Sequence, residues 1–126
     1  MKYLVVLVLL FGGANLFAKN GDLKDTPFSV VKPLIGQGRA MFLEVGSDIC
    51  RPCQRMGKLL YQVKQKHPKY PIYFINVRKE RKVAKQLKVS LIPTQIIFDA
   101  NGKELYRHVG FLSKGEVDTL LKKYKF

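Results

Sequence analysis

The stretch "SDICRPCQRM", residues 47–56, contains both cysteines of this chain. Only Arg51 and Pro52 separate Cys50 from Cys53. A pair at this spacing can be half of a zinc site, a short structural disulfide, or a redox couple that opens and closes. The surrounding sequence distinguishes these three kinds of site.

The first eighteen residues, MKYLVVLVLLFGGANLFA, have the pattern of a secretory signal peptide. Lys2 is followed by an apolar stretch and then by small residues that end at Ala18. The apolar stretch is shorter than the ~20 residues that span a bilayer. We expect a signal peptide at 1–18, with Ala14 as the alternative cleavage position and an uncleaved anchor as the alternative fate. Residues 19–126 are then one periplasmic domain.

The chain is strongly basic, with 23 lysine and arginine residues and 9 acidic residues. Loss of Lys2 with the leader leaves 22 basic and 9 acidic residues, a net charge of +13. The basic residues are spread over the predicted helices, which favours a solvated surface. An acidic partner or an anionic membrane is the alternative, and nucleic acid is not expected as a partner of an exported protein.

Hydrophobic periodicity predicts an α/β domain. Strands are expected at 40–47, 71–77, 94–99 and 103–109, and helices at 50–67, 79–88 and 113–126. A short or broken helix is expected between Thr26 and Gly38, because Pro33 interrupts its apolar spacing. Residues 19–27 are predicted to be a flexible polar lead-in.

Local signals mark the turn and the last helix. Asn101 and Gly102 predict the turn of a hairpin, and Ser113 with Glu116 predicts a capping box. Strands joined through a helix are expected to be parallel, and the hairpin strands antiparallel. The predicted fold is a small mixed sheet with helices on both faces.

Cys50 is expected where a strand ends and a helix begins. The unpaired N–H groups and the positive end of the helix favour a thiolate there, and Arg51 adds a full positive charge. Pro52 fits the first turn and stiffens it. Cys53 lies one turn further in, so we predict that Cys50 attacks a substrate disulfide and Cys53 resolves the mixed disulfide.

The other two kinds of site are disfavoured. A zinc site needs two further ligands, and the only histidines, His67 and His108, are about forty residues apart, unlike the close pairs of structural sites. A disulfide across this spacing closes too short a loop to restrict the unfolded chain much. We expect no metal and no cofactor besides the Cys50–Cys53 couple itself.

With the CRPC pair, two further stretches make the chain resemble the thioredoxin superfamily: "SLIPTQIIFDANGKEL", residues 90–105, and "RHVGFLSKGEV", residues 107–117. The resemblance extends from about Ala40 to Tyr124. It is closest to small exported thioredoxin-like proteins and to the C-terminal domain of thiol:disulfide interchange reductases. It implies a thioredoxin-like fold, with a small mixed central sheet flanked by helices.

The resemblance also assigns further residues to the site. It implies a cis bond before Pro93, which would leave the backbone of Ile92 free to pair with an extended substrate peptide. Gly110 matches a glycine that lets the substrate backbone approach closely. Glu44 stands where the family has a buried aspartate, and it is expected to accept the proton of Cys53 through a water. The alternative is a carboxylate that reaches solvent or a lysine.

Three departures from the family pattern are visible. Ile49 replaces the usual tryptophan before the first cysteine, and Phe74 replaces the lysine that often faces the buried acid. The first strand and helix are shortened to the residues between Lys19 and Arg39. The first two affect proton transfer, and the third affects the outer edge of the sheet.

We therefore expect an exported thiol–disulfide oxidoreductase. It would reduce disulfides of other exported proteins, act as a monomer and be reduced by a membrane thiol donor. A periplasmic disulfide oxidant is one alternative. The other is a basic thioredoxin-like module that binds peptides without turnover.

Overall fold

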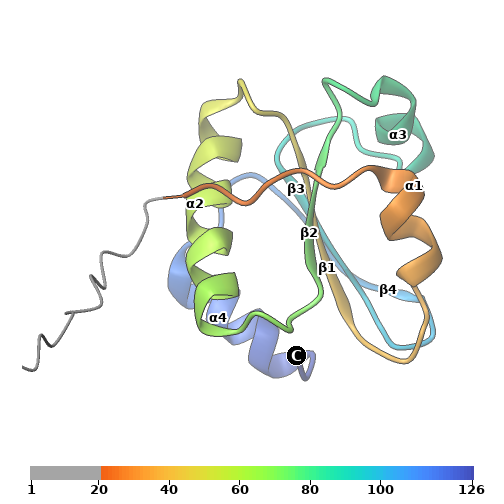
Figure 1. The fold of residues 1–126 in the computed structure, drawn as a ribbon, viewed down its shortest axis with the longest axis vertical. Coiled ribbons are helices and arrows are strands. Elements are labelled where there is room, and N and C mark those ends of the chain that lie inside the picture. Colours follow the sequence, from red (N-terminus) through yellow and green to blue (C-terminus); the bar gives the residue numbers. More distant parts are fainter. Residues whose placement is uncertain (1–20) are drawn as a thin grey trace, which may run out of the picture.

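A mixed four-stranded sheet forms the centre of the computed structural model, which describes residues 21–126 (Figure 1). The strands are β1 (Met41–Gly46), β2 (Ile72–Asn76), β3 (Thr94–Phe98) and β4 (Glu104–Val109). The helices are α1 (Phe28–Val31), α2 (Arg51–Lys66), α3 (Arg81–Gln86) and α4 (Lys114–Lys123), with a 3-10 helix at Lys32–Leu34. The predicted signal peptide, residues 1–18, lies outside the described residues.

The strands are arranged in the order β2-β1-β3-β4. β1 pairs with β2 in parallel and with β3 antiparallel, and β3 pairs with β4 antiparallel. Helices α2 and α4 cover one face of the sheet, and α1 and α3 cover the other (Figure 1). The predicted fold class, a small mixed sheet flanked by helices, is confirmed.

One prediction about strand direction is wrong. β2 and β3 are joined through α3, yet β3 runs opposite to β1 and therefore opposite to β2. Val45, near the end of β1, pairs with Ile75 near the end of β2 and with Thr94, the first residue of β3. The connection through α3 therefore returns the chain to the carboxyl end of β2, where β3 begins.

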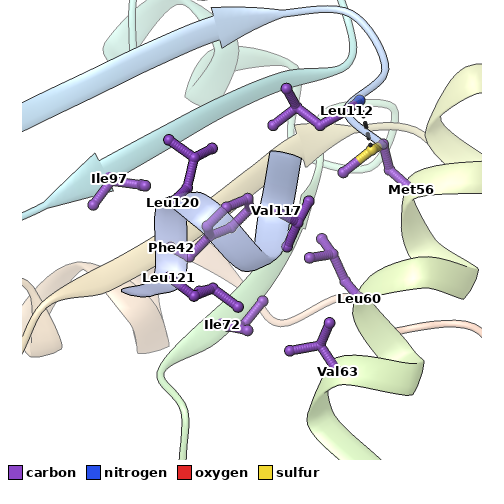
Figure 2. Close-up of a cluster of buried hydrophobic side chains, with 10 residues drawn as sticks. All are labelled: Phe42, Met56, Leu60, Val63, Ile72, Ile97, Leu112, Val117, Leu120 and Leu121. Atoms are coloured by element: carbon purple, nitrogen blue, oxygen red, sulfur yellow. Dashed lines mark hydrogen bonds between the residues drawn. The ribbon is translucent and has the colours of Figure 1, made fainter. Parts of the chain in front are cut away.

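β1 is buried along its whole length, so its side chains divide the core into two layers. Phe42 belongs to the cluster between the sheet and helices α2 and α4, which Figure 2 shows. Leu43 and Val45 point to the other face and pack with residues of α1 and α3. Each large apolar side chain buried in this way contributes about 1.5–3 kcal/mol. This packing fixes the end of β1, where the cysteines follow.

The outer edge of β2 is covered by the chain before α1. The N–H of Thr26 donates to the carbonyl of Phe74 (2.9 Å), and the N–H of Leu23 donates to the carbonyl of Gly57 in α2 (3.1 Å). The prediction of a flexible lead-in is therefore wrong for Leu23, Asp25 and Thr26. Asp25 and Thr26 pair with a sheet edge that would otherwise be open, and Leu23 bonds to α2. Within residues 21–126, no helix is long and apolar enough to cross a membrane.

Candidate active site

Cys50 and Cys53 are joined as a disulfide across the first turn of α2. Cys50 is the N-cap residue, and its sulfur accepts a hydrogen bond from the N–H of Cys53 (3.4 Å). Its backbone is extended, so the helix starts directly after it. Cys50 is half-buried, whereas Cys53 is only 4% exposed. The two sulfurs therefore differ in access, with Cys50 outward and Cys53 inward.

Two residues, Pro52 and Gly46, allow β1 to lead directly into this first turn of α2. Pro52 sits in the first turn of α2, where it has no helical hydrogen bond to lose. Gly46 ends β1, and a Cβ added there would lie 2.9 Å from the sulfur of Cys53. Only glycine allows the strand to pass so close to the inner cysteine. The importance of Gly46 was not predicted from the sequence.

Three segments meet at this end of the sheet. Val45 pairs with Thr94, and Thr94 pairs with Val109, so the end of β1, the start of β3 and the end of β4 lie side by side. The Ile92–Pro93 peptide bond is cis. The N–H of Gly110 donates to the carbonyl of Pro93 (2.8 Å). Fold topology thus brings Cys50, Pro93 and Gly110 together from distant parts of the sequence.

The surface around this junction is apolar and has open backbone groups. Ile49 (73% exposed), Leu91 (66%) and Val109 (52%) each lie within two residues of Cys50, Pro93 or Gly110. Neither the N–H nor the C=O of Ile92 has a hydrogen-bond partner among residues 21–126. An extended peptide could pair with these groups and cover the apolar side chains.

The loop before Cys50 is held by an ion pair that the sequence did not predict. The guanidinium of Arg78, which follows β2, binds the carboxylate of Asp48 at both oxygens, at 2.6 and 2.5 Å. This contact holds the pKa of Asp48 well below its usual range. The paired Arg78 therefore offsets a negative charge that would otherwise oppose a thiolate at Cys50.

Glu44 is buried in β1, with 1% of its surface exposed. It lies opposite Phe74 in β2 and Gln95 in β3, so no lysine faces it from either position. Gln95 Nε2 donates to its carboxylate at 3.2 and 3.4 Å. Burial raises the pKa of Glu44 to about 8, and the hydrogen bond from Gln95 offsets part of that rise. Glu44 is buried as predicted, and burial shifts its pKa in the predicted direction.

Glu44 also lies on the Cys53 side of the sheet. Side chains alternate along a strand, so Glu44 faces the same way as Phe42 and Gly46. Phe42 packs with α2, and the Cβ position of Gly46 touches the Cys53 sulfur. No direct hydrogen bond joins Glu44 to Cys53 in the described chain, so a proton would pass between them through a water.

A cavity of about 260 Å³ borders Cys53 on the side of β2. Its walls include Gly57, Phe74 and Asn76. This space is large enough for several waters, each of which needs about 30 Å³. It gives solvent an approach to the inner sulfur that does not pass over Cys50. A larger cavity of about 830 Å³ between α2 and α4 includes neither cysteine.

The two histidines lie apart from the cysteines and from each other. The ring of His67 stacks on Tyr70 at 4.3 Å, and Nδ1 of His108 lies 2.8 Å from Oε1 of Gln95. Within the described part of the chain, no three His, Cys, Asp or Glu side chains cluster as metal ligands would. Neither histidine lies in a group that could complete a zinc site with the cysteines.

A disulfide across the first turn of a helix, with one sulfur outward and one buried, can exchange with other thiols in two ordered steps. That arrangement defines the class: the chain is a thiol–disulfide oxidoreductase. Residues 29–125 match the profile of the thioredoxin-like domain. The chain belongs to this family.

Named relatives agree with this assignment. The chain is 25% identical over 89 residues to thioredoxin of Mycoplasmoides gallisepticum, a match that covers 71% of this chain and 88% of that protein. It is 28% identical over 85 residues to thioredoxin of Chlamydia trachomatis, covering 68% and 82%. The crystal structure of thioredoxin NaTrxh from Nicotiana alata superimposes with a TM-score of 0.71 at 19% identity, covering 84% and 96%.

Gln95 is the clearest residue that sequence reasoning missed. It is fully buried and contacts both Glu44 and Gly110. The available signal was its place in "TQIIF", residues 94–98, a predicted strand in which a polar amide stands next to apolar residues. A buried amide needs hydrogen-bond partners, so its position indicated a polar contact inside the sheet.

Proposed function

We propose that this protein is an exported reductant that passes two electrons from Cys50 and Cys53 to disulfides of other exported proteins. The observation that carries the proposal is the unequal access of the two sulfurs at the start of α2. Cys50 is the sulfur that a substrate can reach, and Cys53, 4% exposed, lies behind it. This separation assigns attack to Cys50 and resolution to Cys53.

The reaction proceeds in two exchange steps. The Cys50 thiolate attacks one sulfur of the substrate disulfide, which forms a Cys50–substrate bond and releases the other substrate sulfur as a thiolate. Cys53 then loses its proton, attacks the sulfur of Cys50 and releases the second substrate sulfur as a thiolate. The substrate gains two electrons, and the Cys50–Cys53 bond forms.

Local charges support the first step. The N–H groups at the start of α2 and the exposed Arg51 favour the Cys50 thiolate. Pro52 keeps the turn rigid while the disulfide opens and closes. The ionised form of Glu44, whose pKa is about 8, takes the Cys53 proton in the second step through a water.

The substrate class is an extended, partly apolar peptide around a disulfide. Its backbone would pair with Ile92 beside Pro93 and pass over Gly110, while its side chains cover Ile49 and Val109. The geometry requires no second copy of the chain. We also propose that the protein acts as a monomer, has no nucleic-acid partner and is regenerated by a membrane thiol donor.

Export and direction of electron flow are tested together in a bacterial host that expresses the full chain. Cells are fractionated, quenched with acid and alkylated, so that reduced and oxidised Cys50–Cys53 are separated by mass. We expect an exported protein held mainly reduced. Recovery from the cytoplasm would contradict export. A mainly oxidised pool would support a periplasmic oxidant, and a pair that never exchanges would support a peptide-binding module.

A further inference from the structure

Gln95 lies at the centre of a buried polar chain in the sheet. It stands in β3, two residues after Pro93, opposite Glu44 of β1 and His108 of β4. None of its surface is exposed. A buried amide destabilises a fold unless it is hydrogen-bonded, and this position lies beside the apolar Ile96. The interactions of Gln95 must offset that cost.

Both polar atoms of the Gln95 amide have hydrogen-bond partners. Nε2 donates to Glu44 Oε2 at 3.2 Å and to the carbonyl of Gly110 at 3.0 Å, and Oε1 lies 2.8 Å from Nδ1 of His108. The reverse orientation of the amide would point its oxygen at the Gly110 carbonyl, which only accepts. The orientation is therefore fixed, and Nδ1 of His108 is a donor.

The same nitrogen of Gln95 thus joins two parts of the site. Gly110 belongs to the segment that a substrate peptide would cover, and its N–H is bound to Pro93. Glu44 lies in β1, opposite Gln95, on the Cys53 side of the sheet. The amide gives one N–H to each of them, so a movement of the amide away from the Gly110 carbonyl alters the hydrogen bond that reaches Glu44.

We propose that Gln95 transmits the docking of a substrate peptide at Gly110 to the carboxyl group of Glu44. A peptide N–H that binds the Gly110 carbonyl shares that oxygen with Gln95 and weakens the hydrogen bond between them, so the amide moves closer to Glu44. His108 holds the amide in the required orientation. Gln95 and His108 are positioning residues, and this role rests on the proposed function of the site.

The chemical consequence concerns the second exchange step. In the free protein the carboxyl of Glu44 holds its proton at neutral pH, so it cannot accept another. A stronger hydrogen bond from Gln95 favours the carboxylate, and the displaced proton leaves to solvent. Cys53 then gives its proton to Glu44 and attacks Cys50. Glu44 can therefore accept the Cys53 proton only when a peptide is bound.

Two mixed disulfides on Cys50 test this link. A cysteine peptide of about ten residues and N-acetylcysteine amide, each as a pyridyl disulfide, are attached to reduced protein at acid pH, where Cys53 stays protonated. A jump to higher pH starts resolution, and the released thiol is measured. The leaving groups match chemically, but only the peptide reaches Gly110.

In the wild type we expect resolution of the peptide adduct at pH 7 to be about tenfold faster, which corresponds to a change of about one pH unit in the ionisation of Glu44. In Gln95→Met, of similar length but without the amide, both adducts should resolve equally slowly at pH 7. Both should recover at higher pH, where Glu44 ionises without help. Gln62→Met, the same change on an exposed part of α2, is the control.

The pH profile is interpreted with the groups that face this chain. Cys53 and Glu44 lie on the same side of β1, His108 contacts Gln95, and Tyr106 stacks with His108. Glu116 of α4 is close enough for the charge of His108 to affect it. Because the two adducts share all these groups, the ratio of their rates reports the peptide alone.

A second pair of variants covers the case in which Gln95→Met does not fold. His108→Phe removes the donor that orients Gln95, and His108→Asn keeps one. We expect His108→Phe to lose the preference for the peptide and His108→Asn to retain it.

Equal rates for both adducts in the wild type would overturn the proposed link. So would a peptide preference that survives in Gln95→Met or His108→Phe. A wild type that resolves neither adduct would instead contradict the proposed function.

Discussion

Substitution of Glu44 by glutamine should make the protein more stable at neutral pH, and the gain should depend on pH. Glu44 is 1% exposed, and burial raises its pKa from 4.5 to about 8. Since the folded value lies above the unfolded one, protonation favours the folded state. The contribution of Glu44 to the free energy of unfolding is fully present below pH 4.5. It is lost as the pH rises to 8 and does not change above that pH.

The size of the effect follows from these two values. Between pH 4.5 and pH 7 the unfolded chain ionises this carboxyl and the folded chain keeps it protonated. Each pH unit in that interval lowers the free energy of unfolding by about 1.4 kcal/mol. The wild type should therefore lose about 3 kcal/mol over the interval through Glu44, and Glu44→Gln should not.

The assay is denaturant unfolding of both proteins with the disulfide intact, at several pH values between 4 and 8. In this form the cysteines do not titrate. The contributions of all other titratable groups cancel when the unfolding free energies of the two proteins are subtracted. Glu104→Gln is the control, since Glu104 is exposed and its pKa is lowered by Arg107. Its difference from wild type should be flat from pH 5 to 8. A flat difference for Glu44→Gln as well would refute the buried, protonated carboxyl.

The remaining predictions concern the two thiols. In the reduced protein Cys50 should be alkylated before Cys53 at every pH from 5 to 8, because it is the outer sulfur; faster labelling of Cys53 would reverse the assignment. Cys53→Ser should accumulate mixed disulfides with exported proteins, and an equal yield from Cys50→Ser would show that the two roles are not separate. Arg51→Gln should raise the pKa of Cys50 by about half a pH unit, as expected for the loss of one exposed charge. Lys66→Gln, at the far end of α2, should leave the pKa of Cys50 unchanged. An equal rise in both variants would contradict a local effect of Arg51.

Local signals explain why most of the fold could be predicted. The capping box is formed by residues three apart, Ser113 and Glu116, and both of its hydrogen bonds are present. The turn between β3 and β4 depends on Asn101 and Gly102 themselves, with Gly102 at φ +88°. Such features are determined within a few residues, so they can be recognised without knowledge of the rest of the chain.

Features that depend on distant residues could not be predicted in the same way. Arg78 binds Asp48 across 30 positions, and Gln95 binds Glu44 across 51. The direction of β3 depends on where the chain lies after α3, which no local pattern encodes. The sequence predicted that Glu44 would be buried, but its hydrogen-bond partner depended on the register between β1 and β3.

The redox titration of the Cys50–Cys53 pair against glutathione buffers tests the central claim most directly. One exposed arginine and one helix start stabilise the Cys50 thiolate only moderately, and burial of Cys53 disfavours a thiolate on the inner side. We predict a reduction potential near about −270 mV, as in thioredoxins that act as reductants. A value near about −120 mV, typical of a strong oxidant, would contradict the account.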